Sequence, residues 1–254
     1  YLRLSERRAL IQTSDAIGLE LIAAGERDAL AASSRGAGQL LVAAAEAGAT
    51  ELLIGIGGTA SSDGGAGALE VLREARLLGD ERVKLIALCD VRAAWEQAAT
   101  VFARQKGATD DEVVVLERRL GRFAAGLPKD PRGRMMTGAG GGLAGGLWAA
   151  AGAELKSGAA WVLDQVDFTP RMLAARAVIT GEGSLDRQTL LGKAVGEVAT
   201  RARQSGVPCH AIVGRRSISE FDARILDFEN IAEAVDGREI ANSAEQLAGT
   251  LPEH

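Results

Sequence analysis

Glycines, carboxylates, hydroxyls and a lysine are concentrated in one stretch, AVITGEGSLDRQTLLGK at residues 177–193. Its apolar start predicts the end of a buried strand, the Gly-Glu-Gly sequence at 181–183 predicts a tight turn, and helical spacing begins after Lys193. Polar glycine turns between a strand and a helix form ligand sites at the carboxyl ends of strands in open α/β sheets. This combination suits an anionic ligand and a divalent cation better than a protein core. The side chains concerned are those of Glu182, Ser184, Asp186, Thr189 and Lys193.

A second glycine-rich segment, GGTASSDGGAG at 57–67, follows a short apolar strand predicted at 51–56 and precedes a helix predicted at 68–75. Glycines let main-chain N–H groups approach a phosphate, and the following helix N-terminus favours its charge. The segment matches neither the G-x-x-x-x-G-K-[ST] pattern nor a dinucleotide fingerprint. A plain strand-to-helix connection is the alternative, but such a connection needs few hydroxyls. The candidate contacts are Gly57, Gly58, Thr59, Ser61, Asp63 and Gly64.

The composition narrows the class of protein. Hydrophobic residues make up 47% and charged residues 25% of the 254 residues, which is the balance of a globular protein large enough for one α/β domain or two lobes. The net charge of −5 argues against nucleic acid as a partner. No apolar run approaches the roughly 18 residues of a membrane span. Cys89 and Cys209 form neither a disulfide framework nor a metal-ligand spacing, and they fit a reducing cytoplasm.

Hydrophobic spacing predicts the elements that carry these loops. The strand–helix–strand order from 177 to 213 predicts a parallel sheet with a crossover helix. Asp90 directly follows a predicted strand, where a ligand contact and a solvated turn are equally good interpretations. The glycine cluster at 137–146 favours close packing at least as strongly as phosphate contact. Further helices are predicted at 4–24, 39–47, 91–103, 109–123, 168–175, 194–205 and 243–251, and further strands at 83–89, 209–213 and 231–235.

Four segments together resemble one family. They are IGIGGTASSDGGAGAL at 54–69, QKGAT at 105–109, GAGGGLAGGL at 138–147 and VITGEGSLDRQTLLGKAVGEVA at 178–199. In this order and spacing they resemble the bacterial-type glycerate kinases over nearly the whole chain. The resemblance implies ATP-dependent phosphorylation of D-glycerate to 2-phosphoglycerate or 3-phosphoglycerate in the cytoplasm.

The resemblance also implies a two-lobed α/β fold with the active site in the cleft between the lobes. One lobe is parallel and Rossmann-like, and the other is a mixed α/β lobe inserted into it. Residues 1–175 are expected to form the inserted lobe with its glycine-rich loops, and residues 176–254 the C-terminal part of the Rossmann-like lobe. Family members begin with a strand and a Lys- and Ser-bearing loop that have no counterpart here, which implies an N-terminally incomplete chain.

On this resemblance, ATP and Mg²⁺ are the expected cofactors. Asp186 and Glu182 would hold Mg²⁺ or position the substrate hydroxyl, and Lys193 would neutralise a phosphate or the glycerate carboxylate. An N-cap for Asp186 and a solvated helix residue for Lys193 are the alternatives. The expected partner is a small-molecule substrate, D-glycerate, without nucleic acid or membrane, and homodimer formation stays open. Further candidate contacts are Gly181, Gly183, Ser184, Gln188 and Thr189.

Two other functions remain open. A non-catalytic remnant would bind an organic acid or a nucleotide without turnover. A nicotinamide-dependent dehydrogenase would also use glycine turns after strands, but it would need a fingerprint at the first turn and an acid after the second strand. Neither of these features can be placed convincingly in the sequence.

Overall fold

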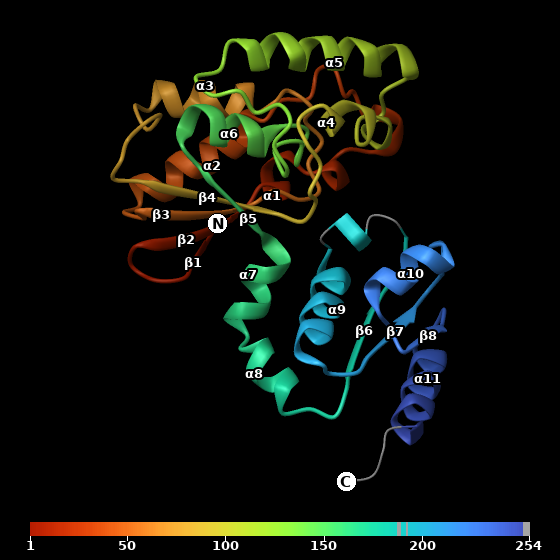
Figure 1. The fold of residues 1–254 in the computed structure, drawn as a ribbon. Coiled ribbons are helices and arrows are strands. Elements are labelled where there is room, and N and C mark those ends of the chain that lie inside the picture. The colour runs from red at the N-terminus through yellow and green to blue at the C-terminus, as the bar shows by residue number, and fades with distance from the viewer. Residues whose placement is uncertain (187–188, 192, 251–254) are drawn as a thin grey trace. The chain divides into compact units, whose positions relative to one another are not determined.

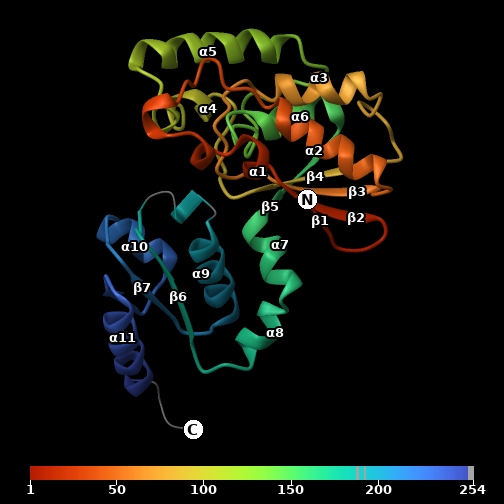
Figure 2. The same cartoon turned by 180° about the vertical axis from the view of Figure 1, so that it is seen from behind.

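The computed structural model describes residues 1–186, 189–191 and 193–250, and the chain forms two compact units, Tyr1–Gly158 and Ala159–His254. Each unit has a sheet of its own, and both are drawn in Figure 1 and, from behind, in Figure 2. The predicted α/β class with parallel strands is confirmed. The predicted lobe boundary after residue 175 stays a prediction. The compact units divide the chain at an earlier point, the start of helix α7 (Gly158–Gln165).

Unit 1 contains a five-stranded sheet in the order β1-β2-β3-β4-β5. The first strand runs antiparallel to the second, and the remaining strands are parallel to one another. The carboxyl ends of four strands therefore meet at one edge of the sheet. The strands are β1 (Leu2–Arg3), β2 (Arg8–Gln12), β3 (Glu51–Gly55), β4 (Lys84–Cys89) and β5 (Glu154–Ser157).

Helices α2 (Arg35–Glu46), α3 (Ala66–Glu74) and α6 (Leu143–Ala151) lie on one side of this sheet in both ribbon views (Figures 1 and 2). They bury the main apolar cluster of the unit against the strands. Helix α5 (Asp110–Ala125) lies farther out and packs on a separate cluster that includes Trp95. Shorter elements are α1 (Ser14–Ile17), α4 (Gln97–Thr100), η1 (Leu19–Leu21), η2 (Ala24–Glu26) and η3 (Arg104–Lys106).

Unit 2 contains a parallel three-stranded sheet in the order β6-β7-β8. Helix α9 (Ala194–Ser205) connects β6 to β7, as the sequence predicts. Its buried face and that of α10 (Glu220–Leu226) pack on one face of the sheet, while α11 (Gly237–Thr250) covers Ile212 on the other. The remaining elements are β6 (Val178–Glu182), β7 (Cys209–Val213), β8 (Asn230–Glu233), α8 (Phe168–Leu173) and η4 (Thr189–Leu191).

The helix predicted at 4–24 is wrong. Residues 8–12 form β2 instead, with Ala9 and Ile11 buried and their neighbours more exposed, which is the alternation of a strand. Pairing with β3 decides the conformation, because the same apolar residues also fit helical spacing. The helix predicted at 91–103 shortens to α4 for a related reason, since Trp95 is buried in a loop before it. Strand β5 was not predicted.

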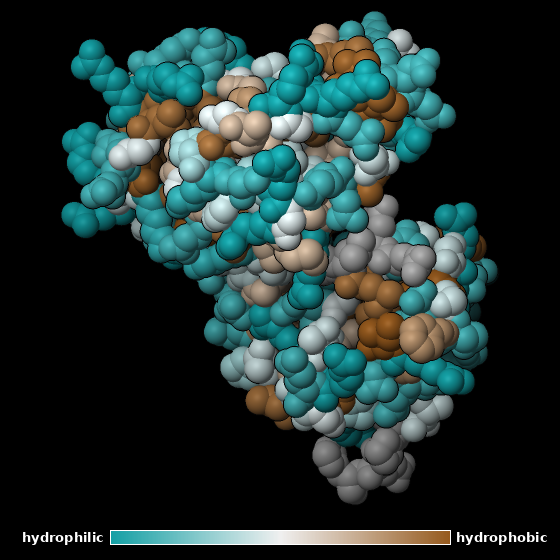
Figure 3. Space-filling view, turned by 45° about the horizontal axis from the view of Figure 1, so that its top comes forward, coloured by the Kyte–Doolittle hydropathy of each residue, from teal (hydrophilic) through white to brown (hydrophobic). Residues whose placement is uncertain are grey.

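Polar and charged side chains cover most of the face of each unit seen in Figure 3, and apolar side chains form separate patches. Among the helices of the described residues, none is long and apolar enough to cross a membrane.

Candidate functional site

The 177–193 stretch places its carboxylates at the carboxyl end of β6. Glu182 is the last residue of that strand, and its Oε1 accepts a hydrogen bond of 2.5 Å from the hydroxyl of Thr189. The Thr189 hydroxyl in turn accepts the amide of Asp186 at 3.3 Å. One threonine thus connects the Glu182 carboxylate to the backbone of Asp186. The arrangement joins the strand end to the loop that precedes α9.

Lys193 lies between these two carboxylates. Its Nζ is 4.0 Å from Oε2 of Glu182 and 4.0 Å from Oδ1 of Asp186. The three side chains are only partly exposed, at 33% for Lys193, 15% for Glu182 and 33% for Asp186. Lys193 is also the N-cap of α9, in extended backbone conformation, so its side chain leaves the helix at the end that favours anions. A compact group of two carboxylates and one ammonium results.

Close packing explains the glycine at 181. A Cβ there would lie 2.2 Å from the carbonyl oxygen of Ile212 in the paired strand β7. The turn predicted at 181–183 is therefore wrong in part, because β6 continues through Glu182. A Cβ at Gly183 would meet nothing within 4 Å, so this backbone remains accessible. Of the two glycines, Gly183 is the one with space for a ligand.

Other predicted residues of this stretch have different surroundings. The hydroxyl oxygen of Ser184 is buried without a hydrogen-bond partner. Gln188 lies outside the described residues. The segment after β7 runs alongside, with the amide of Leu185 bonded to the carbonyl of Arg215 at 2.9 Å. The exposed side chain of Arg215 is a positive group that the sequence analysis did not select, although its place after a strand was a signal.

Glu182 and Asp186 are the side chains from which Mg²⁺ binding is expected. Wherever side chains are described, no group of three or more His, Cys, Asp or Glu residues is arranged to hold a metal. Mg²⁺ commonly uses one or two carboxylates and completes its shell with substrate phosphates and water. Glu182 and Asp186 fit that smaller requirement, with Lys193 as the competing cation.

The carboxyl edge of the unit 1 sheet carries the second group of predicted residues. Gly57 and Gly58 follow β3 and are exposed. A Cβ at Gly58 would lie 3.5 Å from the Cβ of Ser14, which follows β2. Backbone and small side chains from adjacent strands therefore meet at this edge. It provides accessible main-chain groups, as the sequence analysis expected of a ligand loop.

Asp90 completes this edge from the end of β4. Its carboxylate oxygens would lie 3.6 Å from a Cβ at Gly57 and 2.7 Å from a Cβ at Gly158, so the glycines that follow the two neighbouring strands leave room for it. Desolvation raises the pKa of the Asp90 carboxyl above its ordinary value. The side chain is nevertheless exposed. A ligand contact and a solvated turn therefore both remain predictions for Asp90.

The hydroxyls of the glycine-rich loop are less accessible than expected. Thr59 is 4% exposed, and Ser61 and Ser62 are fully buried with no hydrogen-bond partner for either hydroxyl oxygen. Gly64 is also buried, and a Cβ there would lie 2.8 Å from the Trp95 ring. These residues form the buried side of the loop. Gly57 and Gly58 are the predicted contacts that face outward.

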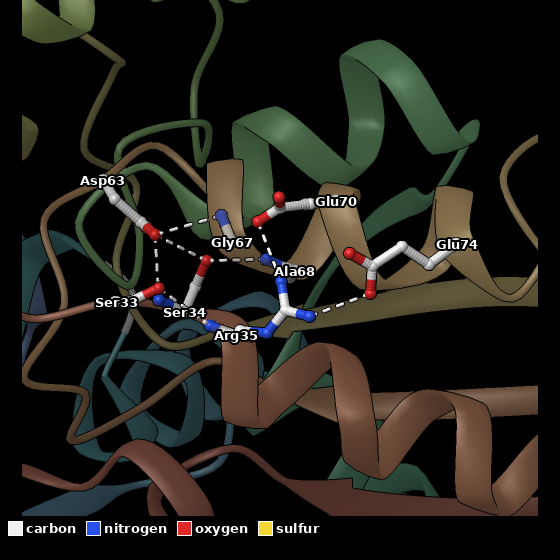
Figure 4. A network of polar contacts seen from close by, with 8 residues as sticks. All are labelled: Ser33, Ser34, Arg35, Asp63, Gly67, Ala68, Glu70 and Glu74. Atoms are coloured by element: carbon white, nitrogen blue, oxygen red, sulfur yellow. Dashed lines mark hydrogen bonds and ion pairs between the residues drawn. The ribbon is translucent and has the colours of Figure 1, made fainter.

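Asp63 holds the starts of two helices together (Figure 4). Its Oδ2 accepts the amide and the hydroxyl of Ser34, each at 2.8 Å, and the amide of Gly67 at 3.2 Å. Its Oδ1 accepts the amide of Gly65 at 3.1 Å. The Ser34 hydroxyl then accepts the amide of Ala68 at 3.0 Å. The carboxylate thus satisfies N-terminal amides of α2 and α3, which is a structural role.

A cavity of about 500 Å³ borders Asp63 on unit 1. Its wall includes Arg73, Arg119 and Phe123 but none of the exposed residues at the sheet edge. The guanidinium of Arg119 already donates to the carbonyl of Leu30 at 2.7 Å. This cavity is therefore separate from the Gly57–Asp90 group.

Comparisons with known proteins agree with the motifs. The glycerate kinase of Bacillus subtilis (strain 168) is 38% identical over 242 residues, which is 82% of this chain, and the glycerate 2-kinase of Escherichia coli (strain K12) is 34% identical over 241 residues, again 82%. The chain spans 63% of the length of each of these two relatives.

A crystal structure from Salmonella typhimurium LT2, named as a glycerate kinase 2, matches with a TM-score of 0.68 and 28% sequence identity. The match covers 96% of this chain and 75% of that one. A model of the family described as "Glycerate kinase family" matches residues 1–81 and 74–251. The chain belongs to the glycerate kinase family.

Proposed function

We propose that the protein, in the polypeptide that contains this chain, transfers the γ-phosphoryl group of ATP to a hydroxyl of D-glycerate. The observation that carries the proposal is the Glu182–Asp186–Lys193 group at the end of β6. Phosphoryl transfer needs an oriented alcohol and neutralised charge, with little covalent work for the protein. Two carboxylates, each 4.0 Å from one ammonium, supply both requirements.

Asp186 is the residue to which we assign the substrate hydroxyl. It is more exposed than Glu182, at 33% against 15%, and the Glu182 carboxylate is already engaged by Thr189. A carboxylate beside the attacking hydroxyl orients it and accepts its proton late in the transfer. Glu182 would keep Thr189 and Lys193 in place and would supply one oxygen to the metal.

Lys193 and Arg215 would neutralise the transferring group. The Lys193 ammonium lies at the N-terminus of α9, where the helix dipole adds to its positive potential. A bound Mg²⁺ would supply positive charge that offsets the negative charge of the transferring phosphoryl group. Glu182 and Asp186 are the residues that would hold this Mg²⁺.

The carboxyl edge of the unit 1 sheet would bind an anionic ligand. Gly57 and Gly58 expose main-chain groups there, and Asp90 can accept a hydrogen bond from a hydroxyl of glycerate or ribose. Thr59, Ser61, Asp63 and Gly64 would shape this loop from within.

We place the reaction in the cytoplasm, because both cysteines are buried free thiols, with pKa values raised to about 12 for Cys89 and about 11 for Cys209.

ADP release with ATP, Mg²⁺ and D-glycerate tests this function, followed by ³¹P NMR of the product. The resonance of 2-phosphoglycerate is expected, in line with the name of the Escherichia coli relative. The 254-residue chain and any longer product of its coding sequence are both assayed. Absence of glycerate-dependent ADP from both proteins would contradict the proposal, whereas ligand binding without ADP would support a non-catalytic binding protein.

A further inference from the structure

Lys106 is a buried cation beneath the glycine-rich loop of unit 1. It belongs to η3, which follows α4, and only 3% of it is exposed. Its Nζ donates a hydrogen bond of 2.6 Å to the carbonyl oxygen of Ser61. A side chain from a distant part of the sequence thus holds the middle of the loop at 57–65. A lysine rarely occupies such a place unless its charge has a use.

The second glycine cluster packs against the same carbonyl group of the loop. A Cβ at Gly141 would lie 2.1 Å from the carbonyl oxygen of Ser61 and 3.0 Å from Nζ of Lys106. The backbone of Ser61 and Ser62 therefore packs closely against both the Lys106 ammonium and the glycine turn. Their hydroxyl oxygens have no hydrogen-bond partner, so these hydroxyls do not fix the conformation of the segment. The Lys106 ammonium is a polar group that does, and the carbonyl oxygen of Gly141 adds a hydrogen bond of 3.0 Å from the amide of Gly64.

The charges around Lys106 leave it largely uncompensated. Burial lowers its pKa to about 8, and the nearby Asp63 carboxylate opposes that shift. The Asp63 oxygens are occupied by Ser34 and by loop amides. On adjacent segments, the Arg27 guanidinium donates to the carbonyl of Gln105, and Arg104 is paired with Asp110. Within the described part of the chain, no ion pair to Lys106 is found, so its positive charge acts on the loop.

We propose that Lys106 is a positioning residue of the ligand site: its buried ammonium fixes Ser61 and Ser62 against the 140–142 turn and supports anion binding at Gly57 and Gly58. The inference rests on the proposed function for the identity of the anion, either the nucleotide phosphates or the glycerate carboxylate. Lys106 acts through the loop backbone, since its side chain is too buried to contact a ligand.

The test compares Lys106→Met with the wild-type protein and with Lys84→Met. Lys84 is a matched control because it is an exposed lysine paired with Glu154. It lies at the first residue of β4, whereas the proposed ligand site lies at the carboxyl end of that strand. KM for Mg·ATP, KM for D-glycerate and kcat are measured from pH 6.5 to 9.5. Circular dichroism checks that each variant is folded.

We expect Lys106→Met to raise KM for at least one anionic substrate by about tenfold, since a charge-assisted hydrogen bond is lost, while kcat changes less. In the wild type, the same KM is expected to rise with pH through about 8 as Lys106 loses its proton, and this dependence is absent in Lys106→Met. A merely structural lysine would not produce a matching break in the pH profile. Lys84→Met keeps the wild-type values and the wild-type profile.

A folded Lys106→Met protein with both KM values within threefold of wild type would overturn the inference. If that variant does not fold, the wild-type profile decides, because a pH-independent KM for both substrates near pH 8 is equally contrary. An inactive wild type refutes the proposed function alone. In that case calorimetric titration of Mg·ATP and of D-glycerate at pH 7 and pH 9 compares the Kd values of the wild type and Lys106→Met. Kd values that change neither with pH nor with the substitution refute the role of Lys106.

Discussion

The carboxylate of Asp63 accepts both the backbone amide and the hydroxyl of Ser34, each at 2.8 Å. This pair joins the start of α2 to the loop that leads into α3 (Figure 4). The most conspicuous carboxylate of a predicted phosphate loop thus has a structural role. Its contacts allow the loop residues that support the fold to be separated experimentally from those that face ligands.

Asp63→Asn is expected to destabilise the fold by about 2–3 kcal/mol, because an amide cannot accept all the hydrogen bonds that the charged carboxylate accepts. Ser34→Ala should lower the free energy of unfolding by about 1–2 kcal/mol, since it removes one donor to Asp63 and the acceptor for Ala68. Urea unfolding measures both changes. Asp130→Asn, at an exposed ion pair with Arg132, serves as the control with an unchanged midpoint. An unchanged midpoint in Asp63→Asn would show that the network contributes little.

Stability should rise with pH through the titration of Lys106. Its pKa is about 8 in the folded chain against 10.5 in the unfolded one, so between these values the unfolded state binds more protons. The buried charge therefore lowers the free energy of unfolding by about 3 kcal/mol below pH 8, and this penalty disappears between pH 8 and 10.5. Urea unfolding at several pH values measures the slope, and Lys106→Met should lack it. Parallel curves for the two proteins would refute this assignment.

Gly141→Ala should be far more destabilising than Gly152→Ala. Both glycines have positive φ, +67° and +71°, so an alanine at either costs about 1–2 kcal/mol of backbone strain. At Gly141 the added Cβ also lies 2.1 Å from the carbonyl oxygen of Ser61, whereas at Gly152 it meets nothing within 4 Å. The contact should add about 2 kcal/mol or more. Thermal unfolding compares the two variants, and equal losses would indicate that the turn can move away from Ser61.

Asp186→Asn should lower kcat by about 100-fold or more, because it removes the carboxylate that orients the substrate hydroxyl. The amide side chain keeps a similar shape, so the unfolding midpoint should change little. Initial rates of ADP release at saturating ATP and D-glycerate give kcat. Glu220→Gln, at a mostly exposed ion pair with Arg216, is the matched control and should keep wild-type kcat. Near-normal kcat in Asp186→Asn would remove this residue from the mechanism.

Asp90→Asn should reduce activity without loss of stability. Desolvation raises the pKa of the Asp90 carboxyl, so its ionised form at neutral pH destabilises the folded state, and this penalty is relieved as pH falls through the raised pKa. Asparagine removes the charge, and the free energy of unfolding should stay equal or increase. Urea unfolding and ADP release are measured on the same preparation. Wild-type KM and kcat values would assign Asp90 to the solvated turn.

The sequence alone determined the elements whose patterns are local. The helix predicted at 109–123 is α5, which begins with a capping box of Thr109 and Glu112, and the β6–α9–β7 unit followed from an apolar run, a helical segment and a second apolar run. The resemblance of long motifs identified the family. Such features depend on residues close together in the chain, so a linear pattern contains them.

Tertiary structure decided what these patterns could not. Residues 8–12 became a strand because they pair with β3, and Gly181 stayed within β6 because Ile212 lies against it. The hydroxyls of Ser61 and Ser62 turned inward where a distant lysine and a distant glycine turn pack against the backbone of these residues. Each outcome depends on contacts between segments far apart in the sequence. Residue type and spacing therefore identified the ligand loops, whereas burial and pairing decided which of their side chains can reach a ligand.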